Sequence, residues 1–138
     1  MRRLTLILAL FAAGPSRAAE WFTVMGNLAD AATDTVQVDL ENLPPRGDIR
    51  FMDMRVNLAA ARKTASGETI GSYVSKISID CDRDAIVHVE QTRFDGSYWR
   101  GTPSFQRFLE NRPMAFGGLL PNPKARILRA ACARGDMQ

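Results

Sequence analysis

The chain has 138 residues, of which 46% are hydrophobic and 24% are charged, and this composition is typical of one globular domain. It excludes a collagen, a coiled coil and a fully disordered chain. The formal net charge is +3, but Arg2, Arg3 and Arg17 lie in a segment that we expect to be removed, which leaves 15 Lys and Arg against 15 Asp and Glu. The remaining chain is neutral, so it lacks the excess of basic residues that is typical of nucleic-acid-binding proteins.

Residues 1–18 are typical of a secretory signal peptide, because a basic start is followed by an apolar run over residues 4–13 and then by Gly and Pro. Cleavage after Ala18 places Ser16 and Ala18 at the two positions that require small side chains, so we expect the mature chain to begin at Ala19. An uncleaved N-terminal anchor is the alternative. The apolar run is too short to span a bilayer, and we expect no membrane span elsewhere in the chain.

Cys81 and Cys132 are the only cysteines. In the oxidising compartment that a signal peptide implies, an even pair predicts one disulfide bond. Two buried free thiols are the alternative, and a redox function is disfavoured because the chain has no Cys-x-x-Cys motif. No cysteine follows the N-terminal apolar run, so we expect no lipid anchor there.

Alternation of apolar and polar residues predicts strands over residues 36–40 and 52–58, and residues 21–24 are a plausible opening strand. The face of the 52–58 strand that carries two Met is expected to lie in the core. Between the two strands, Pro and Gly predict a turn at residues 44–48. After the second strand, residues 59–69 are expected to form an exposed loop.

Two further alternating segments, residues 76–81 and 85–90, predict a β-hairpin whose loop is residues 82–84. With this loop, the residues that face each other across the hairpin are apolar on one face of the sheet and oppositely charged on the other. This arrangement stabilises a sheet. The predicted facing pairs are Ile79–Val87, Ile77–Val89 and Lys76–Glu90.

Residues 95–121 contain many Gly, Pro and aromatic residues and are expected to be irregular, with room for a short helical turn over residues 105–110. The clearest helix comes last, over residues 124–132, because Asn122 can cap its N-terminus and Pro123 suits the first helical position. Its apolar residues fall within one arc, so we expect the helix to lie on the sheet.

These elements predict one α+β domain over residues 19–138, after the signal peptide. The expected architecture is an antiparallel sheet of about five strands with the C-terminal helix packed on it and one disulfide bond. No internal repeat, low-complexity tract or linker divides the chain.

Several short motifs extend along the mature chain: Trp21, the predicted strand over residues 36–40, the segment 72–76, Asp80-Cys81, and a closing helix that ends in Cys132. Together these motifs resemble the surface-adhesin protein E-like domain family, which comprises small exported bacterial proteins. The resemblance implies an antiparallel sheet with a C-terminal helix tied by one disulfide bond. It also implies a non-catalytic, adhesin-like protein of the cell envelope whose partner is a host extracellular-matrix protein.

Two features differ from the family pattern. The chain has no lipidation cysteine, and Phe116-Gly117-Gly118 stands where we expect a Trp shortly before the last helix. We therefore expect an exported protein that is periplasmic or secreted, and display on the cell surface stays open.

The leading hypothesis is a protein-binding module, and the alternative is a periplasmic accessory or inhibitor protein that acts on an envelope enzyme. A hydrolase is the third hypothesis, but no nucleophile and base pair is visible.

Few residues are candidates for catalysis or metal binding. His88 is the only histidine, and the predicted strand pattern places it on the polar face beside Glu90, which disfavours a His-centred triad or a zinc site. Asp80, Asp82 and Asp84 match the first ligands of a calcium loop, but the Gly and Glu that such a loop requires further along are missing. We therefore predict no enzyme activity, no catalytic residue, no metal site and no cofactor.

The irregular segment over residues 95–112 is the candidate contact surface, because Tyr, Trp and Arg dominate binding hot spots. The candidate partner-binding residues are Tyr98, Trp99, Arg100 and Phe105. The alternative is that these rings only cover an open end of the sheet. Arg-Gly-Asp at residues 46–48 and 134–136 can mediate integrin binding, but Gly and Asp are common in turns, so we give these copies less weight.

Overall fold

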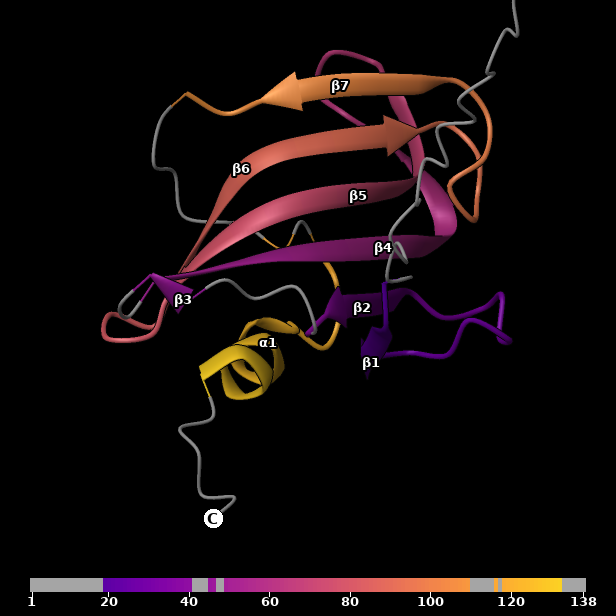
Figure 1. The fold of residues 1–138 in the computed structure, drawn as a ribbon. Coiled ribbons are helices and arrows are strands. Elements are labelled where there is room, and N and C mark those ends of the chain that lie inside the picture. Colours follow the sequence, from indigo (N-terminus) through magenta and orange to yellow (C-terminus); the bar gives the residue numbers. More distant parts are fainter. Residues whose placement is uncertain (1–18, 41–44, 47–48, 110–115, 117, 133–138) are drawn as a thin grey trace, which may run out of the picture.

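The computed structural model describes residues 19–40, 45–46, 49–109, 116 and 118–132. These residues form seven strands and one helix: β1 (Trp21–Met25), β2 (Thr35–Asp39), β3 (Pro45–Arg46), β4 (Ile49–Lys63), β5 (Thr69–Asp80), β6 (Ala85–Phe94), β7 (Pro103–Arg107) and α1 (Lys124–Cys132). The strands pair antiparallel in the order β1-β2-β4-β5-β6-β7, and β3 pairs with the start of β4 (Figure 1). The predicted class, an antiparallel sheet with a C-terminal helix, is therefore confirmed.

One face of the sheet carries the hydrophobic core, because successive side chains of a strand point to opposite faces. On β4, the side chains of Met52, Met54 and Val56 are at most 2% exposed. Their partners on the neighbouring strands β2 and β5 are also buried, namely Val36, Val38 and Ile77. The prediction that the Met-bearing face of this strand lies in the core is confirmed.

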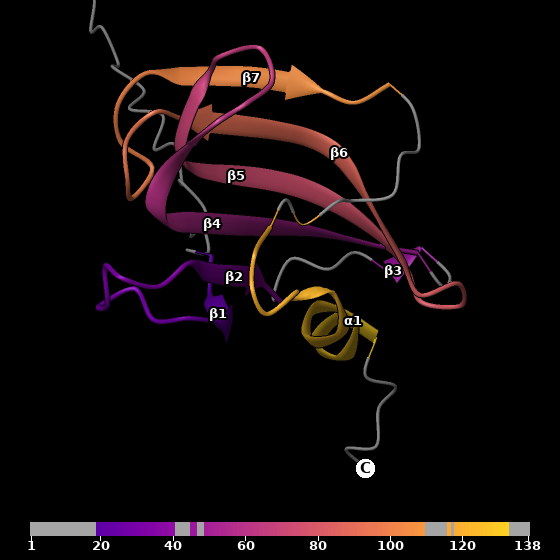
Figure 2. The ribbon, with the colours of Figure 1, turned by 180° about the vertical axis from the view of Figure 1, so that it is seen from behind.

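Helix α1 lies beside β1, β2 and β3 and closes the core at that end of the sheet (Figures 1 and 2). Asn122 Oδ1 accepts a hydrogen bond from the backbone N–H of the first helical residue at 2.9 Å, and Pro123 is buried. Ile127 is fully buried, and a disulfide bond joins Cys132 to Cys81 in the turn after β5. The predicted cap, helix and disulfide bond are confirmed. None of the described residues belongs to a helix with the length and hydrophobicity that a bilayer crossing requires.

The β4–β5 hairpin is longer than predicted. The prediction of an exposed loop over residues 59–69 is wrong, because β4 continues to Lys63 and β5 begins at Thr69. The run of Ala and basic residues before Lys63 has weak strand propensity, and pairing with β5 overrides it. The register shifts between Asn57 and Arg62, and the end of the hairpin arches towards β6 and β7 (Figures 1 and 2).

Strand β7 lies in the segment that was expected to be irregular. The prediction of a short helical turn over residues 105–110 is wrong, because Phe105 belongs to β7 and faces Thr92 of β6. Hydrogen bonds to the preceding strand, β6, favour the extended conformation here, which the composition of the segment does not reveal. With β7 and β3, the sheet has more than the five strands expected.

The β5–β6 hairpin forms as predicted, but its register next to the turn differs by one residue. The observed pairs are Ile79–Ile86 and Ile77–His88 instead of Ile79–Val87 and Ile77–Val89. The cause is a four-residue turn in which Asp80 Oδ1 accepts hydrogen bonds from the backbone N–H groups of Asp82 and Arg83, each at 3.1 Å.

One extra residue of β6, Val89, then shifts the register, so the predicted pair Lys76–Glu90 is confirmed. The four-residue turn places His88 on the core face, and this β-bulge places Glu90 on the opposite face. The expectation that His88 lies on the polar face beside Glu90 is therefore wrong. The His88 ring instead stacks on Phe108, with 4.8 Å between ring centroids.

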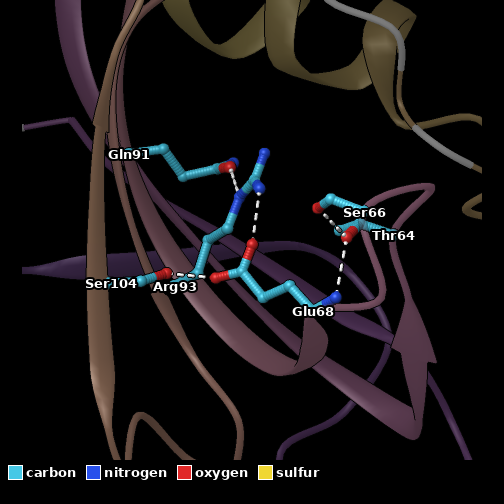
Figure 3. A network of polar contacts seen from close by, with 6 residues as sticks. All are labelled: Thr64, Ser66, Glu68, Gln91, Arg93 and Ser104. Carbon is cyan, nitrogen blue, oxygen red and sulfur yellow. Dashed lines mark hydrogen bonds and ion pairs between the residues drawn. The ribbon is translucent and has the colours of Figure 1, made fainter.

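The arched end of the β4–β5 hairpin is fastened to β6 and β7 by the carboxylate of Glu68 (Figure 3). Glu68 accepts hydrogen bonds from the Ser104 hydroxyl and from Arg93 Nη1, the latter at 3.0 Å. Arg93 Nε also donates to Gln91 Oε1 at 2.6 Å. The hydrogen bonds from Ser104 and Arg93 lower the pKa of Glu68, which favours the charged form that makes these contacts.

The disulfide bond is expected to carry a large share of the stability. Replacing both cysteines, Cys81→Ser with Cys132→Ser, should lower the free energy of unfolding by about 2–5 kcal/mol, because the bond holds α1 to the β5–β6 turn. Urea unfolding followed by circular dichroism measures this loss. Wild-type protein with the bond reduced is the control and should lose a similar amount. Identical urea midpoints for reduced and oxidised wild type would contradict the prediction.

Candidate binding surface

The face of the sheet opposite the core, called the outer face below, carries a row of alternating charges across four strands. Asp53 faces Lys76, Lys76 faces Glu90, and Glu90 faces Arg107. The Glu90 carboxylate lies 3.9 Å from Lys76 Nζ and 3.8 Å from Arg107 Nη2. Burial raises the pKa of Asp53, and the charge of Lys76 opposes this rise. Partly exposed ion pairs of this kind contribute only about 0–1 kcal/mol, so the row matters more for what the outer face can attract than for stability.

Beside this row, the guanidinium of Arg55 lies between two Trp rings. Arg55 Cζ is 4.3 Å from the ring centroid of Trp21 and 4.2 Å from that of Trp99. Arg55 Nε donates a hydrogen bond to Gln37 Oε1 at 2.7 Å, and Gln37 Nε2 donates to Thr23 Oγ1 at 2.9 Å. Burial lowers the pKa of Arg55, but an arginine stays charged in proteins, so both cation–π contacts persist. The stack thereby joins three segments that are far apart in the sequence.

Trp99 belongs to the segment between β6 and β7, residues 95–102, called the 95–102 loop below. Tyr98 and Trp99 have φ angles of 54° and 57°, a left-handed conformation that costs roughly 1–2 kcal/mol for a residue with a side chain. Buried side chains of the sheet offset this cost. Asn57 Oδ1 accepts a hydrogen bond from the Tyr98 N–H at 2.6 Å, and Ser72 Oγ accepts one from the Trp99 N–H at 2.8 Å. The Ser72 hydroxyl also donates to the Gly96 carbonyl at 2.6 Å, so the sheet holds the loop in one strained conformation.

Close backbone packing sets the height of the 95–102 loop above the sheet. A Cβ atom on Gly71 of β5 would lie 2.6 Å from the carbonyl carbon of Gly96, so only Gly allows this approach. At the end of the loop, Asp95 Oδ1 accepts a hydrogen bond from the Thr102 N–H at 2.8 Å. These contacts leave the loop little freedom to move.

The four predicted contact residues differ in their surroundings. Tyr98 is 38% exposed, and its hydroxyl donates to the Leu28 carbonyl at 3.2 Å. Phe105 is 63% exposed on β7, and the register places it on the outer face. Arg100 is exposed, whereas Trp99 is half-buried against the Arg55 guanidinium. Three of the four side chains are therefore open to a partner, and Trp99 also has a structural role.

No sequence pattern predicted that Trp21 and Arg55 accompany Trp99. Alternation over residues 52–58 places Arg55 on the side opposite the Met-bearing face, but no local signal shows which distant rings cover it. Residues 47–48 and 134–136, which complete the two Arg-Gly-Asp tripeptides, lie outside the described residues. Within the described part of the chain, no three His, Cys, Asp or Glu side chains are grouped as a metal site requires.

Ser72→Ala is expected to lower the free energy of unfolding by about 1–3 kcal/mol, because it leaves the Trp99 N–H and the Gly96 carbonyl without their partner. The matched control is Ser97→Ala, at an exposed position of the same loop, which should stay within about 0.5 kcal/mol of wild type. Urea unfolding measures both variants. A loss for Ser72→Ala no larger than that for Ser97→Ala would show that Ser72 does not secure the loop.

Solved structures with the same fold include two of protein E from Haemophilus influenzae. The structure of its crystal form II has a TM-score of 0.52 and 12% identity, and the alignment covers 89% of this chain and 94% of that chain. Protein E from non-typeable Haemophilus influenzae has a TM-score of 0.53 and 12% identity, with 89% of this chain and 82% of that chain covered. No match was found among the curated proteins. At this level of identity, the similarity establishes the fold.

The sequence also matches the family model described as surface-adhesin protein E, over residues 21–133. The matched range begins at the start of β1 and includes the whole sheet, the 95–102 loop and α1. The resemblance inferred from short motifs is thereby confirmed. The chain belongs to the surface-adhesin protein E family.

Proposed function

We propose that this protein is a non-catalytic, adhesin-like protein of the cell envelope that binds another protein through its outer face. The contact surface, called the aromatic surface below, comprises Tyr98, Trp99, Arg100, Phe105, Trp21 and Arg55. The observation that carries the proposal is that the rings of Tyr98 and Phe105 are exposed on backbone that the sheet holds in place. Aromatic and Arg side chains dominate hot spots, and a preordered surface loses little entropy on binding.

The family description, a surface adhesin, supports a protein partner, and the partner that we propose is a host extracellular-matrix protein. The charged row of the outer face lies beside the aromatic surface and would supply the polar rim that protein interfaces have around an apolar centre. An envelope enzyme that the protein assists or inhibits in the periplasm is the alternative partner. The two partners are found in different places, so binding and location together separate the two functions.

Tyr98→Ala and Phe105→Ala should each weaken binding of the partner by about 2 kcal/mol, which is roughly a thirtyfold rise in Kd, because each removes an exposed ring of the aromatic surface. The matched control is Phe22→Ala, because Phe22 is a ring of β1 that is 53% exposed outside the aromatic surface. Surface plasmon resonance against a panel of purified extracellular-matrix proteins measures the three variants. Equal losses for Phe22→Ala and Tyr98→Ala, with all variants folded, would count against the aromatic surface.

The same assay tests the two Arg-Gly-Asp tripeptides. Asp48→Ala and Asp136→Ala should change Kd little, because a three-residue motif by itself is weak evidence of integrin binding, whereas aromatic side chains dominate hot spots. If both aspartate variants lose binding while Tyr98→Ala and Phe105→Ala retain it, integrin-type recognition replaces the proposed mode.

The exported product should begin at Ala19, because Ser16 and Ala18 satisfy the requirement of signal cleavage for small residues. N-terminal sequencing of the protein from periplasmic and secreted fractions checks this, and recovery of Met1 would contradict it.

Protease treatment of intact cells then distinguishes the two functions. Digestion supports the adhesin, whereas protection supports the periplasmic alternative.

A further inference from the structure

A cavity of about 270 Å³ lies under the arched end of the β4–β5 hairpin, on the core face of the sheet. It is separated from the aromatic surface by the sheet itself, and it does not depend on the proposed function. One wall is apolar and is formed by Leu58, Phe116 and Leu119. Its volume is just below the range for ligand sites, roughly 300–1,000 Å³, so only a small molecule would fit.

The charged side chains that line the cavity are all cations, namely Arg62, Lys63 and Arg93. Arg62 forms an ion pair with Asp34 at 2.6 Å, and Arg93 forms one with Glu68 at 3.0 Å. Lys63 is exposed and has no ion pair with any described residue. The cavity therefore has a positive charge at its edge that a bound anion could neutralise.

Two polar side chains inside the cavity are suited to an oxygen ligand. His88 Nδ1 is buried and has no hydrogen-bond partner among the described residues. An unpaired buried polar atom is unfavourable, and a hydrogen-bonding ligand would remove this penalty. Tyr73 also lines the cavity, and burial raises the pKa of Tyr73 to about 12, so its hydroxyl keeps its proton and can donate. Burial lowers the pKa of His88, so the neutral imidazole can present Nδ1 as a donor.

We propose that this cavity binds a small amphiphile with one carboxylate group. The apolar chain of the ligand packs against Leu58, Phe116 and Leu119. Its carboxylate accepts hydrogen bonds from His88 and Tyr73 and is attracted by Lys63. Each part of the ligand thus meets a group that is already in place, which limits the entropy lost on binding.

Octanoate is the probe for this site, with 1-octanol and acetate as matched controls that lack the charge and the chain. His88 is the only histidine, so its imidazole gives a single set of side-chain signals in a ¹H–¹⁵N spectrum. Octanoate should shift these signals to saturation, whereas the two controls at the same concentration should not. Saturation by 1-octanol with the same Kd would overturn carboxylate recognition, and no shift with millimolar octanoate would overturn the site.

Charge variants test the role of the cavity edge by isothermal titration calorimetry. Lys63→Glu should raise the Kd for octanoate by about tenfold or more, because it replaces attraction by repulsion. The matched control Lys124→Glu makes the same change in net charge at an exposed position of α1 and should leave Kd unchanged. Equal effects of both variants would reveal a general charge effect and overturn the assignment.

His88→Phe separates ligand binding from folding. The new ring can keep the stacking on Phe108, and it removes the buried unpartnered nitrogen, so the free energy of unfolding should not fall. Octanoate binding, in contrast, should weaken by about tenfold. A variant that is as stable as wild type and binds octanoate with unchanged Kd would show that His88 does not contact the ligand.

Discussion

The extra residue of β6 opposite β5 determines what each face of the sheet contains. Before Val89, His88 lies on the core face, opposite Ile77, and after it Glu90 lies on the outer face, opposite Lys76. Regular alternation without the bulge would carry Glu90 onto the core face, where an ionised carboxylate beside apolar side chains is costly. The cavity and the charged row therefore both depend on this single β-bulge.

The core face is covered at its two ends by different kinds of contact. Helix α1 is joined covalently to the β5–β6 turn through Cys81 and Cys132. The arched end of the β4–β5 hairpin is held by the hydrogen bonds and ion pair of Glu68. The first contact is covalent, whereas the second consists only of noncovalent contacts. The cavity lies under the end that is held by these noncovalent contacts.

The outer face combines strong local order with exposed rings. The stack of Trp21, Arg55 and Trp99 and the hydrogen bonds from Ser72 use the polar side of the sheet to position the 95–102 loop. Order of this kind stores backbone strain at Tyr98 and Trp99, which the buried polar groups offset. Binding through such a surface would require little rearrangement, because the ordering cost is met when the chain folds.

Sequence alone determined the properties that depend on neighbouring residues. Alternation identified the core-facing side of the strands over residues 36–40 and 52–58, although β2 is buried on both faces. Asn122 marked the start of the helix, and the single pair of cysteines identified the disulfide bond. For the candidate surface, sequence supplied the residue types, while the structure determined that Trp99 is half-buried and Phe105 is exposed. Only the tertiary structure determined the bend of β4, the strand β7, the bulge at Val89 and the meeting of Trp21 with Arg55 and Trp99. Each of these depends on hydrogen bonds and packing between separate segments of the chain, which the alternation within one segment does not specify.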